Sequence, residues 1–539
     1  MFFTNTIQSY FCMHHTQIHL KTAIQFSHYN VCMVVISPIC MVKSPCQLRY
    51  SYLYADDFIR INIAMTLYET LANELKAQIE RGVFEVGNKL PSVRQLSTEH
   101  KVSIATVQEA YRVLEAQQLV EAKPKSGYFV ARSILIDNTP SMTKPPQRPM
   151  DVSQWEDVLD TLLNTFNKDH DAKTLCQFQH AMPTMTAKTL KPLIKRLHEL
   201  TKHRALDGMI YGDVKGDETL RKQLSRLAAA SGCVLQSDEF IVTSGCQEAL
   251  SVCLRAVASA GDVIAVESPG FYGAMQAIKG AELKALEIPT DSETGLSLEA
   301  LKLALDQWPI KAILVAPTVN NPQGFVMPEA KKKALYELAR EYDVAIIEDD
   351  IYGDIAYAYP RPKTIKSFDK DGRVLLCSSF SKTLAPGFRV GWIAPGSYRN
   401  KVLHVKYVSS SMCPTLPQLA IASFIEQGGY DKHIRAMRHH YLSARDALRS
   451  DIKRYFPADT CISYPQGGYV LWVELNSRYD SVKLADEAKQ KGIYVAPGQL
   501  FSATGKYRHC LRFNFIDSTQ AARTEAIQRL GEMLVAQEA

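Results

Sequence analysis

Hydrophobic residues recur at helical spacing in three consecutive segments that begin near Met65. Within each segment they lie three or four positions apart, as on the buried face of an amphipathic helix. These positions are Tyr68, Leu71, Leu75 and Ile79, then Val93 and Leu96, then Val107, Tyr111 and Leu114. Ser92 and Ser103 stand directly before the second and third segments, where a serine side chain can cap a helix. The pattern therefore predicts three short helices with a common core.

The connections between these segments predict how the helices are arranged. A short turn at residues 100–102 joins the second and third helices, which is typical of a helix-turn-helix unit. Residues 120–131 have apolar ends around the sequence Lys-Pro-Lys-Ser-Gly, which predicts a β-hairpin wing. The second helix of such a unit enters the major groove of DNA, so we expect residues from Ser103 to Thr106 to face bases.

Beyond residue 152 the pattern changes to short apolar runs separated by amphipathic segments. Runs of this kind are typical of the buried strands of a mostly parallel sheet, so residues 153–539 are predicted to form an α/β domain. The clearest runs are residues 239–243, 262–267, 312–316, 344–347 and 374–377. Residues 132–152 contain four prolines among polar residues, a composition that predicts a linker between two folded parts.

Composition excludes several classes of protein. The 539 residues include 62 basic and 56 acidic ones, a net charge of +6, and no block of like charge indicates a polybasic tail or an acidic disordered chain. The 12 cysteines form neither a CxxC pair nor a cysteine-histidine ladder, so we expect no disulfide scaffold and no metal site. A reducing, cytoplasmic location is the simplest interpretation.

The first 64 residues differ from the rest, because no helical or strand period runs through them. Their most apolar run, residues 31–42, contains Ser37 and Pro38 and is shorter than the roughly 20 residues that a membrane span needs. We expect no membrane association and treat residues 1–64 as an extension of doubtful structure, with Met65 as the hypothetical natural start.

Charge placement, rather than net charge, points to DNA. Residues 65–131 carry eight basic and eight acidic side chains, so their sum is zero. Several basic and hydroxyl residues nevertheless fall at helix starts, turns and the hairpin tip, where phosphates are met. The candidate DNA contacts are Lys89, Ser92, Arg94, Ser103, Thr106, Lys123, Lys125 and Gly127. A generic three-helix interaction module is the alternative.

Residues 65–131 resemble the winged helix-turn-helix domain of GntR-type regulators. The resemblance rests on Leu90-Pro91-Ser92-x-Arg94, Val102-Ser103-x-x-Thr106-Val107 and Ser126-Gly127-Tyr128-Phe129-Val130. It implies binding to double-stranded DNA. Ile104 and Ala105 depart from the family, which often has an arginine and a hydroxyl residue there, so the resemblance implies no operator preference.

Five short motifs follow the apolar runs of the second part, where open α/β sheets bind ligands. Each alone has an ordinary interpretation as a turn, a cap or a surface loop. The motifs are Thr243-Ser244-Gly245-Cys246-Gln247, Ser268-Pro269-Gly270-Phe271-Tyr272, Asn320-Asn321-Pro322-Gln323-Gly324, Glu348-Asp349-Asp350-Ile351-Tyr352 and Ser379-Phe380-Ser381-Lys382, with Arg389 shortly after the last.

In their joint order these motifs resemble the class I aminotransferases, which are fold type I pyridoxal-phosphate enzymes with a large and a small lobe. The resemblance implies that Lys382 bonds the aldehyde of the cofactor and then moves protons. Asp349 would pair with the ring nitrogen, Asp350 being the second choice by spacing. Phe271 would stack on the ring, with Tyr272 ranked second.

The remaining roles also come from this resemblance. Tyr352 and Asn321 would bond the phenolic oxygen, and Arg512 would clamp the carboxylate of an amino acid. Tyr211 would reach the cofactor phosphate of a partner subunit, which implies a homodimer. The phosphate would also be held by Gly245, Cys246, Gln247, Ser379 and Arg389.

A GntR-type domain followed by an aminotransferase-like domain resembles the MocR subfamily of transcription regulators. The first hypothesis is therefore a DNA-binding regulator that uses pyridoxal phosphate and senses an amino acid or amine. The second is a working aminotransferase with an accessory DNA-binding head, since Lys382, Asp349 and Arg512 are all present. A structural adaptor with a vestigial site is the third.

Overall fold

The computed structural model describes residues 66–80, 83–84, 87–116, 119–123, 126–130, 139–143, 148–151, 174–516 and 519–538. The predicted extension, residues 1–64, and Lys125 of the hairpin lie outside these residues. Across the described ranges, no helix is both long and apolar enough to cross a membrane. The same ranges contain no group of three or more His, Cys, Asp or Glu side chains that could hold a metal ion.

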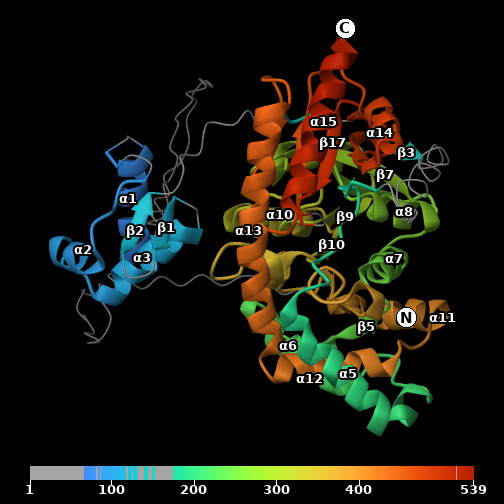
Figure 1. Cartoon of the computed structure of the whole chain (residues 1–539). Helices are drawn as coiled ribbons and strands as arrows, with labels where there is room; N and C mark the ends of the chain where they lie inside the picture. The colour runs from blue at the N-terminus through green and yellow to red at the C-terminus, as the bar shows by residue number, and fades with distance from the viewer. Residues whose placement is uncertain are drawn as a thin grey trace, which may run out of the picture. The chain divides into compact units, whose positions relative to one another are not determined.

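The N-terminal part, here called the head, has three helices and a two-stranded antiparallel hairpin (Figure 1). They are α1 (Leu67–Glu80), α2 (Val93–Glu99), α3 (Ile104–Ala116), β1 (Val120–Lys123) and β2 (Gly127–Val130). The side chain of Ser92 accepts a hydrogen bond from the Gln95 amide at 3.2 Å, and Ser103 accepts one from the Thr106 amide at 3.1 Å. Both predicted caps are confirmed.

The core of the head includes most of the predicted apolar positions, while Tyr68, Ile79 and Val93 are partly buried at its edge. Val107, Tyr111 and Leu114 of α3 are fully buried, and α1 and α2 contribute their own apolar faces to the same cluster. The Tyr111 ring stacks on Tyr128 of the hairpin with 4.1 Å between ring centroids. The wing is therefore fixed to the helix that precedes it.

The C-terminal part, here called the body, is built on one large sheet in the order β3-β7-β6-β9-β10-β11-β12-β5, with the short β8 (Gly295–Leu296) paired to β7. The strands β7, β6, β9, β10 and β11 are parallel, and β12 is antiparallel to both of its neighbours. The bounds are β3 (Met150–Asp151), β5 (Ile241–Thr243), β6 (Val263–Ser268), β7 (Lys284–Asp291), β9 (Ile310–Val315), β10 (Ala345–Asp349), β11 (Val374–Ser379) and β12 (Gly391–Ala394). The predicted parallel α/β sheet is confirmed.

Helices cover both faces of this sheet, because alternate residues of each buried strand point to opposite sides. Ile264 and Val266 of β6 pack with α7 (Cys246–Val257) and α8 (Tyr272–Gly280), whereas Val263 and Ala265 pack with α9 (Leu298–Gln307) and α10 (Glu329–Glu341). The helix α11 (Arg399–Ser409) joins the first layer.

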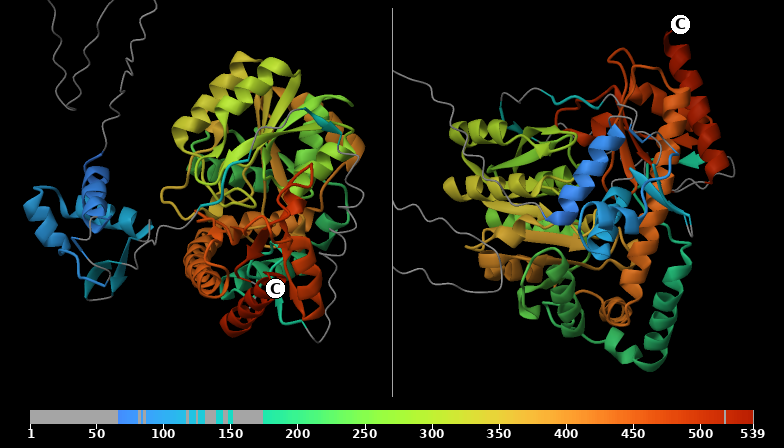
Figure 2. Two further views of the ribbon diagram at one scale, coloured as in Figure 1. Left: turned by 90° about the horizontal axis from the view of Figure 1, so that it is seen from above. Right: turned by 90° about the vertical axis from the view of Figure 1, so that its left-hand side faces the viewer.

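A smaller lobe contains a four-stranded sheet in the order β13-β14-β17-β16. Long helices lie beside it, as the orange and red ribbons of Figure 2 show. Its elements are β13 (Cys461–Ile462), β14 (Val470–Glu474), β16 (Ala496–Pro497), β17 (Cys510–Asn514), α13 (Gly429–Tyr455), α14 (Ser481–Gln490) and α15 (Gln520–Glu538). The helix α12 (Thr415–Glu426) packs against both α5 (Lys191–His203) and α6 (Glu218–Ala230). The two-residue strands β4 (Cys176–Gln177) and β15 (Ile493–Tyr494) pair in parallel.

Part of the predicted linker belongs to the surface of the body. Met150 and Asp151 form β3, the edge strand that pairs with β7. The backbone amide and the hydroxyl of Ser141 each donate a hydrogen bond to the Glu474 carboxylate at 3.0 Å. The large sheet therefore begins inside the segment 132–152 that the proline content had marked as a linker.

Candidate functional site

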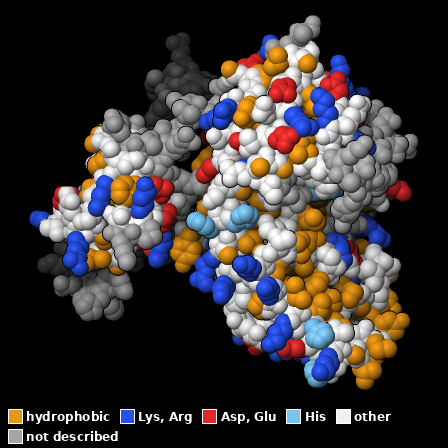
Figure 3. Space-filling model, in the orientation of Figure 1, with side chains coloured by type: hydrophobic (Ala, Val, Ile, Leu, Met, Phe, Trp, Pro, Cys, Tyr) orange, Lys and Arg blue, Asp and Glu red, His pale blue; other side chains and the backbone are white. Residues whose placement is uncertain are grey.

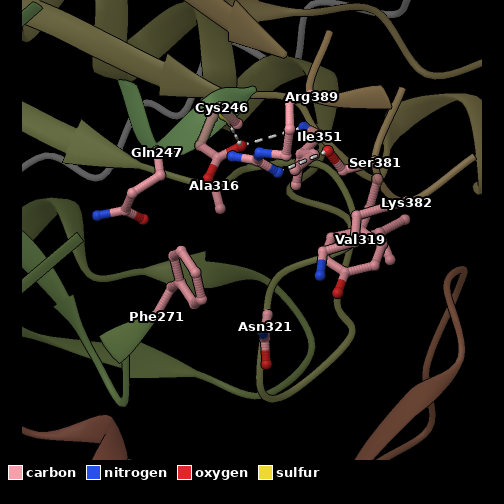
Figure 4. A pocket seen from close by; sticks show the side chains of 12 residues that line it. Cys246, Gln247, Phe271, Ala316, Val319, Asn321, Ile351, Ser381, Lys382 and Arg389 are labelled. Carbon is pink, nitrogen blue, oxygen red and sulfur yellow. Dashed lines mark hydrogen bonds between the residues drawn. The ribbon is translucent and has the colours of Figure 1, made fainter. Parts of the chain in front are cut away.

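A pocket opens at the carboxyl ends of the parallel strands, and all five sequence motifs contribute to it (Figure 4). The empty space, open mouth included, is about 640 Å³. The pocket is lined by Cys246, Gln247, Phe271, Ala316, Val319, Asn321, Asp349, Ile351, Tyr352, Ser381, Lys382 and Arg389. The topology thus gathers residues that are up to 143 positions apart, from Cys246 to Arg389.

Lys382 stands just after β11, with its amine inside the pocket. The Nζ atom donates a hydrogen bond to the backbone oxygen of Ala181 at 2.6 Å. Burial, and next the positive charge of Arg512, lower the pKa of Lys382 to about 8. A larger share of this amine is therefore neutral near pH 7 than for an ordinary lysine, and the neutral form is the nucleophile.

The two adjacent carboxylates at the end of β10 have different surroundings. Asp350 forms an ion pair with Arg361 and lies in a separate cavity. Asp349 lines the main pocket, where its Oδ1 accepts hydrogen bonds from the Ile351 amide at 3.1 Å and from the Cys246 thiol at 3.5 Å. Burial raises the pKa of Asp349 to about 6, because the charged carboxylate is poorly solvated there. A positive charge placed beside it would replace that solvation, so the pair would stabilise each other.

One end of the pocket is suited to a phosphate group. The helix α7 begins there, and its N-cap is Gly245 with φ 88° and ψ 174°. Arg389 donates a hydrogen bond to the Ser244 carbonyl at 2.8 Å and another to the Ser381 hydroxyl at 3.4 Å. A helix N-terminus beside a guanidinium group is a favourable place for an anion.

Ser381 is a pocket residue that the sequence analysis missed. The predicted Ser379 is buried beside the pocket, and its hydroxyl accepts a hydrogen bond from the Ser381 amide at 3.0 Å. The position of Ser381 directly before Lys382 was the signal that could have identified it. Ser379 fixes the backbone of this turn, and Ser381 presents its hydroxyl to the cavity.

On the opposite side lie two buried polar groups. No hydrogen-bond partner for the Asn321 Oδ1 atom is found among the described residues, and the Tyr352 hydroxyl lies beside that of Tyr469. Buried polar atoms are normally hydrogen-bonded, so the Asn321 amide is available to bond a ligand, and Tyr352 lines the same pocket. The ring of Phe271 lines the same pocket, whereas Tyr272 lies behind it, with 4.8 Å between their ring centroids.

Arg512 is a buried cation whose hydrogen-bonding capacity is only partly used. It belongs to β17 of the smaller lobe and is fully buried. One nitrogen donates to the Gln179 carbonyl, while within the described structure neither Nε nor Nη1 has an acceptor. Burial lowers the pKa of Arg512. A carboxylate would satisfy both the free N–H groups and the charge.

Tyr211 does not reach the pocket of its own chain. Its side chain is 91% exposed, next to the exposed apolar residues Leu206, Met209 and Ile210. Figure 3 shows apolar side chains gathered on the face of the body around α5. A tyrosine with these surroundings is placed to contact another molecule rather than its own cofactor site.

In the head, the candidate DNA contacts lie on the surface formed by α2, α3 and the wing. Ser92, Arg94 and Ser103 are exposed near the two helix starts, and Lys89 is exposed in the loop before α2. The wing carries Lys123, whose amine lies 4.6 Å from the centre of the Phe129 ring. Gly127 opens β2 with φ 105°, and the side chain of Thr106 is partly buried.

Comparison with known proteins agrees with this geometry. Residues 180–530 match the family of class I and II aminotransferases, and residues 67–130 match the bacterial regulatory proteins of the gntR family. The chain belongs to both families. Their combination in one chain is that of the MocR-type transcription regulators.

Full-length relatives share the same two parts. The uncharacterized HTH-type transcriptional regulator YjiR of Escherichia coli is 47% identical over 468 residues, which cover 87% of this chain and 98% of the relative. YdcR of the same organism, also an uncharacterized HTH-type transcriptional regulator, is 33% identical over 470 residues, 87% of this chain and 99% of the relative. The chain is therefore a DNA-binding transcription regulator with an aminotransferase-like body.

The solved structures show what the body resembles. The kynurenine aminotransferase of Pyrococcus horikoshii, in complex with PMP, has a TM-score of 0.64 and 31% identity, covering 71% of this chain and 95% of its own. The cofactor of this family is pyridoxal phosphate. The pocket fits that group, because it offers an anion site at α7, a carboxylate at Asp349 and buried polar groups at Asn321 and Tyr352.

Proposed function

We propose that this MocR-type regulator senses an amino acid through the pocket of its body. The observation that carries the proposal is Arg512, a fully buried guanidinium with two nitrogens that lack acceptors among the described residues. A phosphate group is already provided for at the start of α7, inside the pocket. A carboxylate is therefore the group that Arg512 is suited to bind, and an α-amino acid carries one next to the amine that the cofactor bonds.

Each pocket residue has a defined part in this proposal. Bound pyridoxal phosphate supplies an electron sink. Lys382 would hold it through its aldehyde and carry protons, and Asp349 would keep the ring nitrogen protonated. Phe271 would cover the ring, while the Tyr352 hydroxyl and the side-chain N–H of Asn321 would donate to the phenolic oxygen.

The phosphate site uses neutral and charged donors together. Backbone amides at Gly245, Cys246 and Gln247 begin α7, and Arg389 adds a charge. Ser381 contributes its hydroxyl directly, and Ser379 supports it. Burial raises the pKa of the Cys246 thiol. The thiol therefore stays neutral beside Asp349.

We also propose that the regulator is a homodimer. Tyr211 is exposed beside Leu206, Met209 and Ile210. In a single copy of the chain these apolar side chains are in contact with water, which is energetically unfavourable. Packing this surface against a second copy would bring Tyr211 to the partner's phosphate site. DNA binding by a dimer also implies two half-sites in the target DNA.

A second function, transamination, is favoured by the completeness of the site. Lys382, Asp349, Tyr352 and Arg512 would all be required for turnover. The first three line one pocket, and the buried charge of Arg512 is close enough to lower the pKa of Lys382. An assay for keto-acid product from the amino acid that binds separates a sensor from an enzyme, because sensing requires binding alone.

The test is a titration of the cofactor-loaded protein with a panel of amino acids and the matching amines. We expect amino acids to change the absorbance of the bound cofactor in the wild type and to do so far more weakly in Arg512→Gln. Amines, which lack the carboxylate, should be affected little by this substitution. Equal responses of both variants to amino acids would contradict the role of Arg512.

A further inference from the structure

The first turn of α3 presents an apolar surface to solvent. Ile104 is the first residue of the helix, and 49% of it is exposed. Ala105, directly after it, is exposed as well. Ile104 is absent from the core of the head, which Val107, Tyr111 and Leu114 fill from the other face of the helix. Packing within the head therefore does not explain an isoleucine at this position.

Several polar groups near Ile104 are engaged within the helix. The Ser103 hydroxyl accepts the Thr106 amide at 3.1 Å and lies 2.9 Å from the Thr106 hydroxyl. One turn further on, Glu109 is paired with Arg112 at 3.1 Å. The exposed Gln108, four positions after Ile104, is the polar neighbour on the same helix face. In the first turn itself, Ile104 is the large side chain exposed to solvent.

This position decides what Ile104 can contact. In a helix-turn-helix domain the N-terminal residues of the second helix meet base edges in the major groove. The one apolar group that a base pair presents there is the 5-methyl group of thymine. Other exposed apolar residues of the head, such as Leu67 at the start of α1, are not on the recognition helix.

We propose that Ile104 is a specificity-determining residue that selects thymine through its methyl group. An arginine at the same place would instead select guanine by two hydrogen bonds. The inference rests on the DNA-binding function of the head and adds to it the kind of base that the first turn of α3 prefers.

The experiment starts from duplexes selected by the full-length protein from a random library. Each thymine of the selected site is then replaced, one at a time, by deoxyuridine, which removes the methyl group and keeps the hydrogen-bonding edge. We expect one thymine per half-site whose replacement weakens wild-type binding about fourfold, the effect of exposing one methyl-sized group.

Two variants identify the residue responsible. Ile104→Ala should bind the thymine and deoxyuridine duplexes with nearly equal affinity, and Ile104→Arg should select guanine at that position in a fresh selection. Leu67→Ala is the matched control, since Leu67 is also an exposed apolar residue at a helix start. It should keep the full difference between the two duplexes.

The outcomes separate this inference from the function beneath it. A protein that binds no duplex above background would overturn the DNA-binding function of the head. Tight binding with no thymine in the selected site, or with no loss on any methyl removal, would overturn the role of Ile104 alone. So would a methyl effect of the same size in Ile104→Ala.

Discussion

Gly245→Ala is the substitution whose effect on cofactor binding follows most directly from the structure. Gly245 adopts φ 88° and ψ 174°, a backbone region that only glycine occupies without strain, at a cost of about 1–3 kcal/mol for other residues. A Cβ atom there would also lie 2.5 Å from the Nη2 atom of Arg389. The loop of Gly245→Ala must therefore relax, and Arg389 must move out of the phosphate site.

To bind the phosphate, the Gly245→Ala loop must return to the wild-type backbone conformation, which is strained for alanine. The free energy of this strain is lost from the affinity for pyridoxal phosphate. A cost of about 1–3 kcal/mol corresponds to a dissociation constant for pyridoxal phosphate raised about 5- to 140-fold. The assay is a titration of cofactor-free protein followed by the absorbance of the bound cofactor, with thermal unfolding measured in parallel to show that the variant is folded.

Gly261→Ala provides a matched control. Gly261 has nearly the same φ, 86°, but nothing within 4 Å of its added Cβ, and it precedes β6 at the end of the strand away from the pocket. It should lose stability and keep its affinity for the cofactor. A folded Gly245→Ala protein that binds pyridoxal phosphate as tightly as the wild type would refute the assignment of the phosphate site.

Three further predictions concern single side chains. The rate at which pyridoxal phosphate attaches to the cofactor-free protein should rise with pH, because the neutral Lys382 amine attacks. Its pKa of about 8 makes the rate half-maximal near pH 8 and level about one pH unit above that. Arg512→Gln should move the midpoint to higher pH, and a wild-type midpoint near about pH 10 would contradict the lowered pKa. Lys382→Ala should lose the visible absorbance of the bound cofactor, and an unchanged spectrum would reject Lys382 as its attachment point. Arg94→Ala should weaken binding to unrelated duplexes by a similar factor and reduce the salt slope by about 1, whereas unchanged binding would remove Arg94 from the DNA interface.

Much of the fold follows from local patterns in the sequence. The helices of the head were predicted because their apolar spacing and capping serines lie within a few residues of one another. The strand ends that build the pocket were predicted because parallel strands place their carboxyl ends at one edge. Asp349 was preferred to Asp350 by its spacing to Tyr352, and the structure adds the reason, since Arg361 already pairs with Asp350.

Contacts between distant segments were beyond such reasoning. The carbonyl of Ala181 meets Lys382 across 201 positions, and that of Gln179 meets Arg512 across 333; no periodicity encodes these pairs. The spacing within Ser379-Phe380-Ser381 does not tell which hydroxyl faces the cavity. The strand β3 has only two residues, too few for an alternating pattern, so composition alone suggested a linker there.

The most direct test of the account is the response of DNA binding to the ligands of the body. Binding of the full-length protein to its own upstream DNA is measured with and without pyridoxal phosphate and each amino acid that binds, in the wild type and in Lys382→Ala. We predict that the amino acid changes the affinity or the footprint of the cofactor-loaded wild type and leaves Lys382→Ala unaffected. Identical DNA binding under all conditions, together with steady production of keto acid by the wild type, would contradict the regulator that senses an amino acid and establish an aminotransferase with a DNA-binding head.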